Sequence, residues 1–193
     1  MRKSIVFILV ACFIVGLTSG VSAFDGKRKG FILGLGAGLG LTSYTQSVGT
    51  LTSDRENSFG LQTDFKIGLG TSEVFQIYWQ SKVSWFGLDN ALGNNVTIAH
   101  GFGGIGFTYF LQPTPQSAYL TGGLGYSTWT TPFESNSDTW IGFGLTVGAG
   151  YELSSHLNLE GTLMFGKPTN DIMGIDISTT GMTIRATIIY MGY

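Results

Sequence analysis

Six charged residues lie at alternate positions along stretches that are otherwise apolar or small. They are Asp64, Lys66, Lys82, Glu152, Glu160 and Arg185. Charges removed from water are costly unless they are paired and hydrogen-bonded. We therefore expect these side chains to face one another inside the fold and form a network of ion pairs. The alternative is that they line a narrow path for ions.

Catalytic chemistry is poorly supported by the sequence. A nucleophile, a base and an orienting group must meet at one place, but the two histidines, His100 and His156, fall in a predicted strand and a predicted turn, at different depths. Gly101, Gly103 and Gly106 match the glycine spacing of a dinucleotide site, yet a strand follows them instead of the required helix. We expect no enzyme, no cofactor and no metal site, since no cluster of histidines or carboxylates has ligand spacing.

The elements that position the charges are strands. Apolar residues recur at every second position in roughly eight runs of about 9–14 residues, a period that predicts β-structure. The runs are 31–41, 59–69, 75–85, 96–111, 118–126, 141–153, 157–166 and 182–190. Their connections alternate between long and short, and 42–57 is the longest predicted loop. In 96–111 the apolar parity changes, which we interpret as a β-bulge near residues 101–104.

The non-apolar face of these strands decides the fold class. A soluble barrel such as a lipocalin needs a charged exterior, and typical soluble domains are about 25% charged. This chain is 11% charged, and the second face of its clearest strands is mainly glycine. The apolar face is therefore expected to contact lipid. The sequence predicts an all-β protein, an eight-stranded antiparallel up-and-down transmembrane β-barrel.

Aromatic residues near the predicted strand ends indicate two membrane interfaces, where rings with polar tips gather. The expected interface residues are Trp85, Trp129 and Trp140 at one end and Tyr109, Tyr151 and Tyr190 at the other.

The first segment, residues 1–23, has the pattern of a cleaved secretory signal peptide: Arg2 and Lys3, then an apolar core, then Val21-Ser22-Ala23. Residues 24–193 would form the barrel domain. The single cysteine, Cys12, lies in the predicted signal peptide. Cleavage would leave 8 basic residues, 10 less 2, against 12 acidic ones, and nothing indicates a nucleic-acid partner.

These patterns together resemble the small eight-stranded outer-membrane barrels of Gram-negative bacteria, the OmpA/OmpX-type and opacity-like proteins. Tyr193 resembles the terminal aromatic of that family's assembly signal. In the family this residue shares parity with the lipid face, whereas Tyr193 shares parity with Met191 and Ile189, opposite the apolar run 182–190. Either the last strand bulges or the match is imperfect.

The resemblance implies an exported outer-membrane protein, a monomer that contacts outer-membrane lipids and lipopolysaccharide and is assembled by periplasmic chaperones and the outer-membrane assembly machinery. The expected role is structural or surface-interacting, with a lumen plugged by paired charges. A narrow conduit for ions or small solutes is the alternative. A lipid A-modifying enzyme is disfavoured, because the His-x-Ser arrangement of those small barrels that act as lipid A deacylases is missing: Gly101 and Phe102 follow His100.

Overall fold

The computed structural model describes residues 27–89, 95–135, 137–172 and 174–193. The predicted signal peptide lies outside these residues. The described strands are β1 (Gly30–Val48), β2 (Leu51–Thr52), β3 (Glu56–Gly70), β4 (Phe75–Asp89), β5 (Asn95–Phe110), β6 (Ala118–Thr130), β7 (Trp140–Ser154), β8 (Leu157–Ile172) and β9 (Ile175–Gly192). No helix in the described part is long and apolar enough to span a bilayer.

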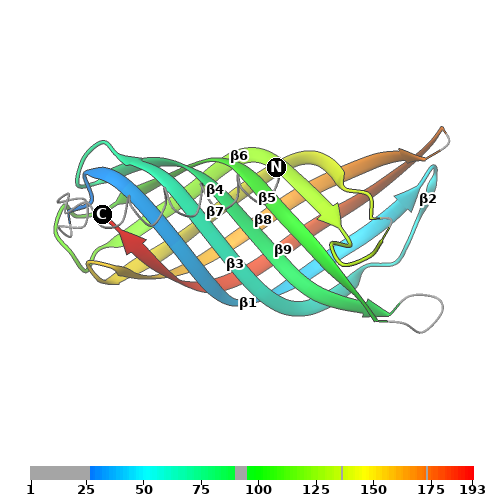
Figure 1. Ribbon diagram of the computed structural model, residues 1–193, viewed down its shortest axis with the longest axis horizontal. Helices are drawn as coiled ribbons and strands as arrows, with labels where there is room; N and C mark the ends of the chain where they lie inside the picture. The colour runs from blue at the N-terminus through cyan, green and yellow to red at the C-terminus, as the bar shows by residue number, and fades with distance from the viewer. Residues whose placement is uncertain (1–26, 90–94, 136, 173) are drawn as a thin grey trace, which may run out of the picture.

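The strands form one closed antiparallel barrel. β1 pairs with β3, each later strand pairs with the next, and β9 returns to pair with β1. The two-residue β2 pairs with the last residues of β1 and does not run the length of the barrel. The wall therefore consists of the eight long strands. Figure 1 shows them tilted to the long axis, with the C-terminus at one end and β2 at the other. The predicted eight-stranded antiparallel barrel is confirmed.

The outer wall carries large apolar side chains. Leu35, Ile105 and Tyr190 are about 60% exposed, at 59%, 60% and 61%. On the same strands the alternate residues are buried, so the apolar face of each strand forms the outer surface of the barrel. Exposing this apolar surface to water would cost free energy, whereas contact with lipid chains would not. The outer wall therefore fits the hydrocarbon core of a bilayer.

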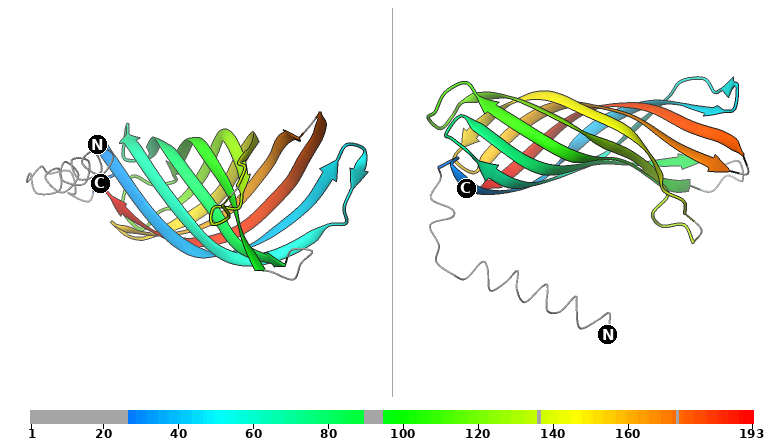
Figure 2. Two further views of the ribbon diagram at one scale, coloured as in Figure 1. Left: turned by 45° about the vertical axis from the view of Figure 1, so that its right-hand side comes forward. Right: turned by 90° about the horizontal axis from the view of Figure 1, so that it is seen from above.

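The loop prediction for residues 42–57 was largely wrong. β1 continues to Val48, and its residues 42–48 pair with Thr183 through Ile177 of β9. β3 begins at Glu56. Ladder hydrogen bonds form whatever the side chain, so the strands extend past the apolar band. Figure 2 shows the resulting β1–β3 hairpin, with β2, projecting at the end away from the C-terminus.

The bulge predicted near residues 101–104 was also wrong. β5 pairs with β4 in unbroken register from Phe75↔Tyr109 to Asp89↔Asn95. Ile98 is buried, at 5% exposure, and Val96 packs with it inside the barrel. The parity changes because the lumen is apolar at this level, not because the strand shifts. A register shift does occur in β7, between Glu152 and Ser154.

Candidate functional site: the filled lumen

The six charged residues selected by parity all point into the barrel. Their exposed fractions lie between 0% and 4%. Five of them form one connected layer, and Glu152 belongs to a separate group near the C-terminal end.

The charge layer is a chain of alternating sign across the lumen. Lys82 Nζ lies 2.7 Å from Glu160 Oε1 and 3.1 Å from Asp64 Oδ2. Lys66 Nζ lies 2.6 Å from Glu160 Oε2, and Arg185 pairs with Asp64. β4 and β8 stand four strands apart in the ring of eight, on opposite sides of the barrel. The Lys82–Glu160 pair thus spans the diameter.

Hydroxyl groups complete the coordination of both carboxylates. Thr187 donates to Asp64 at 3.0 Å, and Thr162 donates to Glu160 at 3.1 Å. The Tyr119 hydroxyl donates to the other Glu160 oxygen at 3.3 Å. A buried network in which carboxylates have several partners is rigid, because moving one member leaves others unsatisfied.

A second layer, toward the β2 end, consists of uncharged polar groups. Fully buried His100 contacts the Thr183 hydroxyl through Nδ1 and the Ser127 hydroxyl through Nε2, both at 3.2 Å. Thr183 is hydrogen-bonded to Thr42 at 2.9 Å, and Thr42 to Ser84 at 2.8 Å. His100 on β5 and Thr183 on β9 also lie four strands apart. This layer therefore crosses the lumen as well.

A third layer, which we call the aromatic layer, lies on the β2 side of the second layer that contains His100. Its buried members are Tyr44, Phe86, Ile98 and Trp129, and Leu88, Val96 and Trp140 pack against them. The ring centroids of Tyr44 on β1 and Trp129 on β6 are 5.0 Å apart. These strands again face each other across the barrel.

This layer corrects two interface assignments. Trp129 is only 4% exposed and points inward, and Trp140 packs against the same interior cluster. Their position near a strand end predicts an interface location, but the parity of β6 and β7 puts Thr128 and Ile141 outside. Of the remaining four, Tyr109, Tyr151 and Tyr190 are exposed on the outer wall, at 49%, 45% and 61%. Trp85 is on the same face and donates to Thr63 Oγ1 at 2.9 Å.

Arg28 fills the barrel at the C-terminal end. Its guanidinium pairs with Glu152, with Nη2 2.5 Å from Oε2, and lies 3.8 Å from the centroid of the Phe110 ring. It also donates to the backbone carbonyls of Glu73, Gln112 and Thr114. We call this group, Arg28 with Glu152 and the three carbonyls, the Arg28 latch. Parity could not find it, because Arg28 precedes the first strand; its only signal is the basic stretch 27–29.

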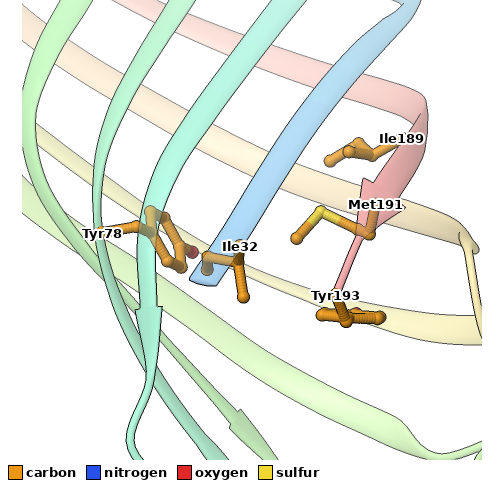
Figure 3. Packing of buried hydrophobic residues seen from close by; sticks show 5 residues of the cluster. All are labelled: Ile32, Tyr78, Ile189, Met191 and Tyr193. Atoms are coloured by element: carbon orange, nitrogen blue, oxygen red, sulfur yellow. The ribbon is translucent and has the colours of Figure 1, made fainter. Parts of the chain in front are cut away.

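Tyr193 lies inside the barrel, not on the lipid face. It is 2% exposed and belongs to a buried cluster with Ile32, Tyr78, Ile189 and Met191. Figure 3 shows these side chains between the ends of β1, β4 and β9. β9 pairs with β1 in continuous register from Leu33↔Gly192 to Val48↔Ile177, so the strand does not bulge. The lipid-facing aromatic near this terminus is Tyr190.

Within the described ranges, no group of three or more histidine, cysteine or acidic residues is placed to hold a metal ion.

No protein-family model and no curated protein matches this sequence. Solved structures do match. OprG, an outer membrane protein of Pseudomonas aeruginosa, superimposes with a TM-score of 0.53 at 10% identity, covering 87% of this chain and 99% of that one. Neisserial surface protein A gives 0.51 at 11% identity, covering 83% and 96%. At these identities the likeness shows the fold.

The barrel, its apolar wall and these neighbours define the class. The chain is a small eight-stranded β-barrel of the Gram-negative outer-membrane type, so the predicted resemblance is confirmed at the level of the fold.

Proposed function

We propose that the protein is a structural and surface-presenting barrel of the outer membrane whose lumen does not conduct. The observation that carries this proposal is the Lys82–Glu160 ion pair, which joins opposite walls through side chains no more than 1% exposed. An eight-stranded barrel has an interior just wide enough for side chains to fill. A pair across its diameter leaves little room for a continuous file of water.

Three further groups support closure at other depths. The His100–Thr183 contact and the Tyr44–Trp129 contact each join opposite strands, and the Arg28 latch draws three carbonyls and Glu152 toward one guanidinium. Opening a path would require every level to rearrange. The cost favours a plugged barrel over a narrow conduit.

The end opposite the C-terminus is the surface we assign to interaction. Its strand ends and connections carry an excess of acidic residues: Asp54, Glu56, Glu134, Asp138, Asp171 and Asp176, against Arg55 and Lys167. In outer-membrane barrels the longer connections face outward, and the longest connection between consecutive barrel strands, residues 131–139, lies at this end. We therefore infer that this acidic rim faces the cell exterior, beside the lipopolysaccharide, and that residues 27 and 193 face the periplasm. A monomer, delivered by periplasmic chaperones to the assembly machinery, fits this arrangement.

The burial of Ser127 and His100 disfavours an enzymatic role. Ser127 and His100 have the separation of a nucleophile and a base, but both are fully buried beneath Trp129. A substrate would have to displace the aromatic layer to reach them.

The proposal is tested by reconstituting the refolded protein, residues 24–193, in liposomes that hold a potassium gradient. We expect potassium to leak no faster than from protein-free liposomes. A matched preparation carrying Leu51→Arg, a change in the exposed β2, should behave the same. Potassium release that rises in proportion to the amount of inserted wild-type barrel would replace the plugged barrel with the conduit.

A further inference from the structure

The charge layer has one positive charge in excess. Arg185, Lys66 and Lys82 meet only two carboxylates, Asp64 and Glu160, in the ion pairs among the described residues. The carboxylate of Glu152 does not balance this excess positive charge, because it is already paired with Arg28 in the Arg28 latch. Burying a net charge in a low-dielectric interior is costly unless an opposite charge accompanies it.

Among these three cations, Arg185 is the one with a buried nitrogen atom that has no hydrogen-bond partner in the described part of the chain. Its Nη2 donates to Asp64 and to the carbonyl of Thr63, but among the described residues its Nη1 has a single acceptor, the thioether sulfur of Met164, at 3.9 Å. Its Nε, fully buried, has no hydrogen-bond partner in the described part of the chain. A guanidinium has five N–H donors and stays charged in proteins, whereas a thioether is a weak acceptor.

Arg28 shows what full coordination looks like in the same barrel. Its Nε and Nη2 donate to the two Glu152 oxygens, and its remaining N–H groups donate to three carbonyls. All five donors therefore have oxygen acceptors. Both arginines are 2% exposed, so the difference lies in their partners and not in their burial.

We propose that the lumen binds one small monovalent inorganic anion, of the chloride class, against Nε and Nη1 of Arg185 beside Met164. A water molecule would satisfy the N–H groups but leave the excess charge. Met164 and Arg185 are enclosed, at 0% and 2% exposure, which favours a small anion over a bulky one. This site depends on the charge and coordination of Arg185, so it stands whether or not the lumen conducts.

The test is the unfolding equilibrium of the refolded protein in chloride and in gluconate, a bulky anion that matches the ionic strength. For a dissociation constant of about 0.1 M, raising chloride from about 0.01 M to about 1 M lowers the unfolding constant roughly tenfold. Sodium gluconate over the same range should change it by less than about twofold, since buried pairs are weakly screened.

Met164→Glu supplies the missing negative charge within the polypeptide. It should make the unfolding constant independent of chloride and smaller than that of the matched neutral variant, Met164→Gln. The glutamine variant should keep the chloride dependence of the wild type. If Met164→Glu fails to fold, the wild-type comparison still decides.

A crystal grown in bromide locates the ion directly. An anomalous peak within hydrogen-bond distance of Arg185 Nε supports the proposal. Equal unfolding constants in chloride and gluconate, or bromide peaks confined to the protein surface, would overturn it.

Discussion

Lys82 on β4 and Glu160 on β8 join opposite walls of the barrel, with 2.7 Å between Nζ and Oε1. Each is also bonded to a second partner of opposite charge, Asp64 and Lys66 respectively. The pair is therefore the centre of the charge layer and acts as a strut across the lumen.

Removing one end of this strut should destabilise the barrel strongly. Lys82→Met leaves Glu160 and Asp64 with fewer cationic partners, and breaking a buried pair from one side costs about 3–5 kcal/mol. Urea unfolding in detergent, followed by the gel mobility of folded and unfolded forms, measures the loss. Arg55→Met, in an exposed connection, is the control and should cost less than about 0.5 kcal/mol. Similar losses for the two variants would show that the strut contributes no stability.

The lipid face is tested at Leu145, which is 38% exposed on the outer wall of β7. Leu145→Arg should impair insertion, because an arginine near the bilayer midplane of a barrel costs about 2–4 kcal/mol. Leu51→Arg, at a position 76% exposed in β2, should insert normally. The yield of folded protein in liposomes compares them. Normal insertion of Leu145→Arg would place the outer wall in water.

The Arg28 latch should require an arginine and not only a positive charge. Arg28→Lys keeps the charge but cannot reach Glu152 and three carbonyls at once, because an ammonium has three donors. We expect faster amide exchange in residues 111–117 and 71–74. Lys29→Ala, at the exposed neighbouring position, is the control. Unchanged exchange in Arg28→Lys would mean that the carbonyl contacts do not hold this end closed.

The orientation of the tryptophans predicts their quenching. In variants that retain one tryptophan, Trp85 should be quenched by brominated lipids, since its ring is on the outer wall. Trp129 should resist both brominated lipids and aqueous acrylamide, because it is packed against Tyr44 and Phe86. Strong lipid quenching of Trp129 would restore the interface assignment made from the sequence.

Strand parity was enough to predict the fold and which charges face inward. It placed Asp64, Lys66 and Lys82 in the lumen because alternation holds along each strand. It could not predict that Lys82 meets Glu160, since contacts across a barrel depend on strand tilt and stagger, which parity does not encode. Distance from the strand end predicts the wrong face for Trp129, because strand parity turns its side chain inward. Arg28 was missed because it lies before the first strand.

The central claim, that side chains crossing the diameter close the lumen, is tested most directly by the current through refolded barrels in a planar bilayer. We expect no steady conductance steps from the wild type. A combined variant, Lys82→Ala with His100→Ala, Trp129→Ala and Arg28→Ala, removes one residue from each closing level and should produce discrete steps. Steps from that variant would show that the assay detects an open barrel. Steady wild-type steps of the same size as those of the combined variant would contradict the claim, because the cross-barrel contacts would then not block the path.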